Sequence, residues 1–104
     1  MHDLKQHIAR REEALGRVRD LLIERLRVPF EPEQIDLDAP LFGTGLGLDS
    51  VDAVELIVAI ETEFGLEIPE GATGPWAFRT VHSLVEFVLD PPPLVRRAPR
   101  GGAA

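Results

Sequence analysis

The first apolar residues of the chain recur at helical spacing. They stand three, four or seven positions apart, with arginines and glutamates between them: Leu4, Ile8, Leu15, Val18, Leu22 and Leu26. Such spacing predicts an amphipathic helix, which must end before Pro29. Asp3 could cap a very early start, whereas Gly16 weakens the middle. We predict a helix over residues 12–27 and treat residues 1–11 as an N-terminal extension or the early part of that helix.

The strongest helical signal runs from Asp49 to Phe64. Asp49 is a good N-cap, and Asp52, three residues later, can support the same helix end in a variant of the capping box. Gly65 is well placed as the C-terminal stop. One apolar stripe of this helix is expected to face the core: Val54, Ile57, Ile60 and Phe64.

A final helix is predicted from Thr80, its N-cap, to Asp90, ahead of three prolines. Four residues of this helix are expected to face inward: Val81, Leu84, Val85 and Val88. Residues 66–79 contain two prolines and two glycines, which leave room for only a short helix near Trp76. Residues 91–104 have the Pro-, Arg- and Gly-rich composition of a disordered tail.

Residues 29–48 form a long loop, because they hold three prolines and three glycines and show no helical period. Their apolar side chains suggest that the loop packs across the core: Ile35, Leu37, Leu41, Phe42, Leu46 and Leu48. No segment alternates like a strand. The predicted fold class is therefore all-α, one domain over residues 12–90 with three main helices and a short helix before the last.

The charge distribution bears on the partners. The net charge is −7, and from Pro29 through Phe78 there are eleven Asp and Glu and no Lys or Arg. Such a block repels nucleic acid and attracts proteins with basic patches.

No apolar run is long enough to span a bilayer, so no stable membrane insertion is expected. The chain has no cysteine, and its N-terminal residues lack the apolar core of a secretory signal, which predicts a cytoplasmic location.

Ser50 stands where the glycine-rich loop meets the second helix. A phosphate-binding loop would need a preceding strand and nearby basic residues, and the sequence has neither. A catalytic serine would need a base, and of the three histidines, at positions 2, 7 and 82, only His82 keeps that alternative open. The remaining alternative is a plain first-turn serine behind a capping aspartate. We predict no catalytic residue, and no metal site, because nothing completes a ligand set with the histidines.

The rest of this helix favours a role for Ser50 in recognition. Val51 and Val58 stand two turns apart, beside Asp52 and Glu55 and away from the expected core stripe. Exposed apolar side chains among like charges are typical of a small docking surface for a basic partner. The serine, the docking surface and the acidic block thus coincide on one helix.

From about Leu15 to Leu89 the chain resembles the acyl carrier proteins (ACPs), helical proteins that hold acyl chains on 4′-phosphopantetheine. The strongest match is similar to the family's Leu-Gly-x-Asp-Ser-Leu-x-x-Val-Glu-Leu attachment motif, with Val51 in place of the common leucine: Leu46-Gly47-Leu48-Asp49-Ser50-Val51-Asp52-Ala53-Val54-Glu55-Leu56. Three further matches follow in the family's order: Glu61-x-Glu63-Phe64-Gly65, Ile68-Pro69 and Phe78-Arg79-Thr80-Val81.

This resemblance implies that Ser50 carries 4′-phosphopantetheine through a phosphodiester, and that Asp49 caps the helix beside it. The side chains that would meet partner enzymes are Val51, Asp52, Glu55 and Val58. The implied partners are a phosphopantetheinyl transferase and the acyl-ACP synthetases, ketosynthases or acyltransferases of fatty-acid, lipid or polyketide-type synthesis. The thiol of the arm would form the thioester, so the chain is expected to be a carrier and not an enzyme. The carrier is also expected to be a monomer.

One segment departs from the family pattern. Residues 71–79, GATGPWAFR, are longer and less acidic than is usual before the last helix, and they bring in Trp76 and Arg79. We therefore expect a specialised free-standing carrier. A peptidyl or aminoacyl carrier is an alternative that the acidic block disfavours, and a carrier-like subunit without cofactor is one that Ser50 argues against.

Overall fold

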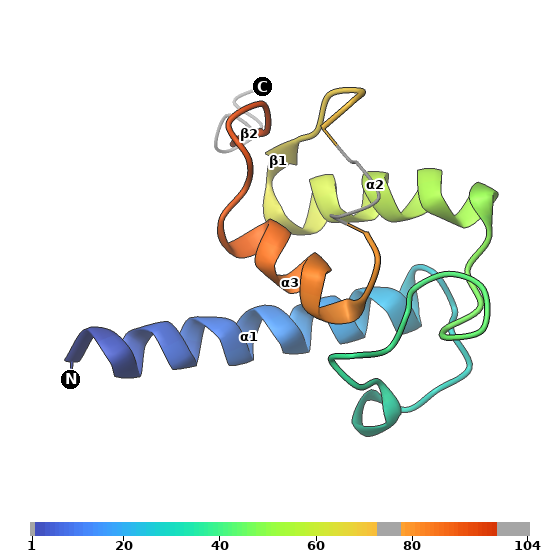
Figure 1. Cartoon of the computed structure of the whole chain (residues 1–104), viewed down its shortest axis with the longest axis horizontal. Helices are drawn as coiled ribbons and strands as arrows, with labels where there is room; N and C mark the ends of the chain where they lie inside the picture. The colour runs from blue at the N-terminus through green and yellow to red at the C-terminus, as the bar shows by residue number, and fades with distance from the viewer. Residues whose placement is uncertain (1, 73–77, 98–104) are drawn as a thin grey trace.

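A computed structural model of the chain describes residues 2–72 and 78–97 (Figure 1). Its helices are α1 (His2–Glu24), α2 (Ser50–Phe64) and α3 (Val81–Leu89), with a single 3-10 turn, η1 (Pro32–Gln34), between the first two. Strands β1 (Leu66–Glu67) and β2 (Arg96–Arg97) form one short antiparallel pair. The all-α class is confirmed, with this small strand pair added. The short helix expected near Trp76 lies outside the described residues.

Helix α1 begins before the predicted range of 12–27, since residues 2–11 are helical as well, and it ends at Glu24, three residues before the predicted end. Its second half carries the core-facing side chains, among them Val18 and Leu22, which are fully buried. Leu4 and Ile8 are about half exposed, at 57% and 48%, because the N-terminal turns extend beyond the other helices (Figure 1). The helical spacing therefore indicated the secondary structure of this segment but not its burial.

Helix α1 ends in a turn that reverses the chain beside the start of α2. Arg27 has a φ of +60°, and the backbone N–H of Val28 donates to the carbonyl of Leu22 at 3.2 Å. This bond closes a seven-residue turn, and the left-handed position within such a helix-ending turn is usually a glycine. A residue with a side chain is disfavoured there by about 1–2 kcal/mol.

The loop over residues 29–48 packs across the core, as predicted. Most of its apolar side chains are buried: Ile35, Leu41, Leu46 and Leu48. The loop is also hydrogen-bonded to the start of α3, because Leu41 N–H donates to the Arg79 carbonyl at 2.9 Å and Val81 N–H donates to the Ala39 carbonyl at 3.0 Å. The loop thus joins the chain before α2 to the chain before α3.

The buried face of α2 differs from the predicted stripe. Leu56, Ala59 and Ile60 are fully buried, whereas Val54 is 65% exposed. Ile57 and Phe64 are partly buried against the core. The expected stripe was therefore wrong at Val54. Because all five residues from 56 to 60 are apolar and only Glu55 separates them from Val54, the spacing of apolar residues alone could not decide which face turns inward.

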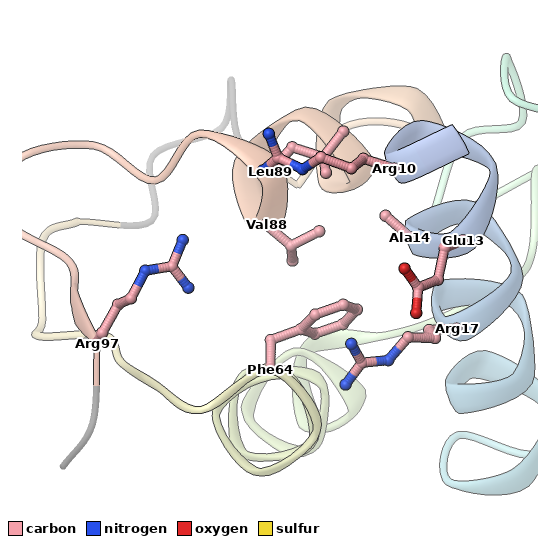
Figure 2. A pocket seen from close by; sticks show the side chains of 8 residues that line it. All are labelled: Arg10, Glu13, Ala14, Arg17, Phe64, Val88, Leu89 and Arg97. Atoms are coloured by element: carbon pink, nitrogen blue, oxygen red, sulfur yellow. The ribbon is translucent and has the colours of Figure 1, made fainter. Parts of the chain in front are cut away.

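Arg17 of α1 holds the C-terminal end of α2 (Figure 2). Its Nε donates to the Glu63 carboxylate at 3.0 Å, its Nη2 donates to the Glu63 backbone carbonyl, and its guanidinium lies 4.5 Å from the centre of the Phe64 ring. A cation is favourable beside the unsatisfied carbonyls at a helix C-terminus. Gly65 ends the helix in the left-handed conformation, which confirms the predicted stop.

Helix α3 follows the sequence prediction closely. The Thr80 side chain accepts a hydrogen bond from Ser83 N–H at 3.1 Å, and all four residues expected to face inward are buried: Val81, Leu84, Val85 and Val88. The helix ends at Leu89, and Asp90 is its C-cap. Arg11 of α1 forms an ion pair with Glu86 and so fixes α3 against α1.

Residues 91–97 differ from the disordered tail expected from their composition. Val95 is buried, and Arg96 and Arg97 pair in register with Glu67 and Leu66 of β1. The apolar contact of Val95 and the strand hydrogen bonds offset the entropy of ordering this short segment. The rest of the expected tail, residues 98–104, lies outside the described residues. None of the helices in the described ranges is both long and apolar enough to span a membrane.

Gly45 is the glycine whose replacement should disturb the loop most. A Cβ built on Gly45 would lie 2.7 Å from the Pro40 carbonyl carbon and would clash with its oxygen, so the backbone would have to move. We expect Gly45→Ala to lower the free energy of unfolding by about 1–3 kcal/mol. Gly16→Ala is the matched control, because a Cβ there meets nothing within 4 Å. It should raise that free energy by about 0.5–1 kcal/mol. Urea unfolding measures both, and equal effects would contradict the prediction.

Candidate functional site

Two reciprocal hydrogen bonds fix the first residue of α2. The Asp49 carboxylate accepts from Asp52 N–H at 3.0 Å, and the Asp52 carboxylate accepts from Asp49 N–H at 3.0 Å. This is the capping box predicted from the sequence. It places Ser50 as the first helical residue, with its side chain exposed.

The cap also keeps Asp49 ionised. The hydrogen bond from Asp52 N–H is the largest cause that holds the pKa of Asp49 below its usual value of 3.8. A carboxylate at a helix N-terminus meets the positive end of the helix dipole, which favours the same charge state. The residue before Ser50 is therefore an anion at neutral pH.

The glycines before α2 serve the turn of the backbone. Gly43 and Gly47 have φ values of +71° and +82°, which favour glycine over residues with a side chain. Two main-chain bonds close the loop, from Leu48 N–H to the Leu41 carbonyl at 3.1 Å and from Leu46 N–H to the Pro40 carbonyl at 2.9 Å. The backbone conformation of the loop thus explains its glycines, and a phosphate-binding loop is not needed to explain them.

An exposed apolar surface follows Ser50 along α2. Val51, Val54 and Val58 are 76%, 65% and 45% exposed. They recur at helical spacing on one face, and we call them the valine surface. Val51 and Val58 were identified from the sequence, whereas Val54 was missed because it had been assigned to the core stripe. The carboxylates of Asp52 and Glu55 border the same face.

A groove lies between this face and the end of α1. It encloses about 640 Å³. Its lining comes from the turn that follows α1 and from the first half of α2: Arg25, Leu26, Arg27, Ser50, Val51, Asp52, Val54, Glu55 and Val58. Sequence reasoning missed the two arginines, because α1 and α2 run antiparallel and only the fold brings the end of one beside the start of the other (Figure 1).

The described histidines do not join Ser50. No histidine lines the groove, and His7 and His82 are exposed on α1 and α3. His82 Nδ1 lies 3.5 Å from Arg11 Nη2, on the side of α3 that meets α1. Within residues 2–72 and 78–97, no group of three or more His, Cys, Asp or Glu side chains could hold a metal ion. The groove therefore offers an exposed hydroxyl with charged and apolar neighbours, and no base from a histidine.

A second pocket lies at the other end of α2, between Arg10, Arg17, Phe64 and Arg97 (Figure 2). Along the axis of the helix it is about 21 Å from Ser50, at 1.5 Å per residue. Its guanidinium groups surround an apolar floor, but Arg17 is already bound to Glu63. This pocket is separate from the groove at Ser50.

Comparison with known proteins gives a consistent match over this region. The family model described as "Phosphopantetheine attachment site" matches residues 16–88, which include the capping box and Ser50. The chain is 48% identical over 56 residues to proteins named "Acyl carrier protein" from Rhodopseudomonas palustris strain TIE-1 and from Nitrobacter winogradskyi. Each alignment covers 54% of this chain and 67% of the relative.

The depressed pKa of Asp49 predicts a pH-dependent contribution of the cap to stability. Because the folded pKa lies below 3.8, the stabilisation is present above that pH and is lost as the pH falls through the folded pKa. We expect Asp49→Ala to be less stable than the wild type near neutral pH, with the difference shrinking below about pH 4. Chemical unfolding followed by circular dichroism across this range measures it.

Asp49→Asn is the control for this titration, because asparagine caps a helix without ionising. The stability difference between Asp49→Asn and Asp49→Ala should stay constant with pH. If the difference between the wild type and Asp49→Ala were equally constant, the cap would not depend on the ionised carboxylate.

Proposed function

Because the chain belongs to the acyl carrier proteins of the phosphopantetheine attachment family, we propose that Ser50 is the residue that bears its 4′-phosphopantetheine. Membership makes the chain a carrier and not an enzyme, with the prosthetic group held covalently. The observation that carries the assignment is the capping box, which holds an exposed serine in the first turn of α2 within the matched residues.

The state of the other hydroxyls supports this choice. Within the described part of residues 16–88, the hydroxyl of Thr62 donates to the Val58 carbonyl at 3.0 Å, and the hydroxyls of Thr80 and Ser83 are bonded in the cap of α3. Thr44 is exposed in the preceding loop, but it does not line the groove. The Ser50 hydroxyl makes no hydrogen bond to any described residue and lines an open groove. It is therefore accessible to a modifying enzyme that brings its own base.

The surroundings of Ser50 fit the group chemically. A helix N-terminus is a favourable place for the negative charge of a phosphodiester. The groove beside it has space for a flexible arm, and it offers guanidinium groups at one wall and exposed valines at another. When bound, the group supplies the terminal thiol that forms a thioester with the cargo, so the chain needs no cysteine.

The carrier role assigns the valine surface and its carboxylates to docking. Asp52 and Glu55 would attract enzymes with basic patches, and Val51 and Val58 would be covered in the complex. The partners we propose are a phosphopantetheinyl transferase and the acyl-ACP synthetases, ketosynthases or acyltransferases of fatty-acid, lipid or polyketide-type synthesis. We place the carrier in the cytoplasm as a monomer, and the absence of cysteine supports that compartment.

The attachment is tested by intact mass. The protein is incubated with coenzyme A, Mg²⁺ and a broad phosphopantetheinyl transferase. We expect the wild type to gain one phosphopantetheine and Ser50→Ala to gain none. Thr44→Ala, which removes an exposed hydroxyl of the preceding loop, is the control and should be modified like the wild type. A gain that persists in Ser50→Ala would move the attachment to another residue, and no gain on the wild type with several transferases would refute the carrier proposal.

Charge reversal tests the docking surface. Glu55→Lys, alone and with Asp52→Asn, should slow modification at low salt by about tenfold or more, because steering by complementary charge is lost. The dependence of the rate on salt should fall with it. Asp52→Asn keeps an oxygen for the capping box while it removes the charge.

The control for this experiment is Glu70→Lys. Glu70 is exposed in the same acidic block but does not line the groove. The Glu70→Lys substitution should change the rate of modification much less than Glu55→Lys. Equal effects of the two reversals would mean that the transferase responds only to net charge, and unchanged rates would mean that the acidic face is merely solvated.

A further inference from the structure

We propose, resting on attachment at Ser50, that Arg25 and Arg27 bind the phosphodiester of the prosthetic group and direct its arm into the groove between α1 and α2. The two arginines come from the turn that follows α1, and they line the same groove as Ser50. A phosphodiester joined to the serine oxygen would therefore form within the space that these side chains border.

The charge around Ser50 calls for such a counter-ion. The groove already holds Asp52 and Glu55, and Asp49 is an ionised neighbour in sequence. Attachment adds one more negative charge at the same place. The whole segment from Pro29 to Phe78 contains no Lys or Arg, so nothing in α2 or its preceding loop can offset that charge. Among the residues that line the groove, the only cations are the two arginines of the turn after α1.

The side chains of Arg25 and Arg27 are also free to bind an anion in this groove, whereas several arginines of α1 are bound to other residues. Arg11 is paired with Glu86, Arg17 is bound to Glu63, and Arg19 Nε donates to the Ile35 carbonyl at 2.9 Å. Within residues 2–72 and 78–97, neither Arg25 nor Arg27 has a side-chain hydrogen bond or ion pair. A planar guanidinium can donate two parallel hydrogen bonds to the oxygens of a phosphodiester, which makes it well suited to this partner.

The backbone at Arg27 is a further and independent indication. Its φ of +60° puts it at the left-handed position of the turn, where glycine would be favoured. A residue with a side chain in this conformation points to a role of the side chain outside the turn itself. Direct contact with an anion in the groove would supply that role.

The apolar lining indicates the course of the arm. Beyond the arginines, the groove is bordered by Leu26 and the valine surface. An arm anchored at its phosphodiester would therefore run over the same valines that we assign to docking. A partner enzyme would displace the arm from these side chains as it binds, while the phosphodiester stays beside the arginines.

The test uses the holo-protein, with loading at Ser50 first confirmed by intact mass. The ³¹P NMR resonance of the phosphodiester is compared between the wild type, Arg25→Gln/Arg27→Gly and Lys5→Gln. Lys5→Gln removes one exposed charge from α1 far from the groove and serves as the control. Urea-unfolded wild-type holo-protein gives the resonance of a phosphodiester without tertiary contacts.

We expect the wild-type and Lys5→Gln resonances to differ from the unfolded reference, and the double variant to move to it. Salt at about 1 M, where the Debye length is about 3 Å, should shift the wild type in the same direction. Arg27→Gly alone should move the resonance part of the way while its unfolding midpoint stays equal to or above that of the wild type, because glycine suits the turn. Loss of the contact would then not be a loss of fold.

The outcomes separate this inference from the proposed function. Failure of the wild type to gain mass would refute attachment, whereas normal loading with one ³¹P resonance shared by all folded variants would refute only the role of the arginines. If the double variant changed the transferase rate but not the resonance, Arg25 and Arg27 would contact the enzyme and not the arm, which would also overturn the inference.

Discussion

The reciprocal hydrogen bonds between Asp49 and Asp52 are the constraint on which the site depends. A helix can start at any of several residues in an apolar run, and a shift of one residue would rotate every side chain of α2 by about 100°. The capping box sets that start at Ser50. In the helix that begins there, Leu56, Ala59 and Ile60 pack into the core and the valine surface lies outside. The cap thus fixes the place of Ser50 at the start of a helix whose packing leaves one face exposed.

The two ends of α2 are fixed by different parts of the chain. At the N-terminal end, the glycine loop brings the backbone to Asp49, and its bonds to Arg79 and Val81 tie it to the start of α3. At the C-terminal end, Arg17 of α1 binds Glu63 and covers the Phe64 ring. Because separate elements hold its two ends, the helix presents Ser50 and the valine surface on a rigid support. Rigidity of this kind preserves the shape of a docking face.

The sequence predicted local features well, because each depends on a few neighbouring residues. The cap at Asp49, the stop at Gly65 and the inward face of α3 are of this kind. It predicted less well where apolar residues lay on more than one face of a helix, as at Val54. It also failed where the prediction used composition alone, because composition did not reveal that Val95 is buried against the core. The sequence could not predict the groove, because only the antiparallel packing of α1 and α2 brings Arg25 and Ser50 to the same groove.

The packing of α1 against α2 gives a structural reason for the separation of acidic and basic residues along the chain. The acidic block supplies the field that attracts basic partners, and for that purpose any cation within it would be a disadvantage. Yet an anionic group on α2 would stand in the same field and be repelled by it. Cations in the turn that follows α1 lie outside the block in sequence but line the same groove as its serine, so they can offset the local charge while the outer face of α2 stays acidic. The antiparallel contact of two helices reconciles these opposing electrostatic demands.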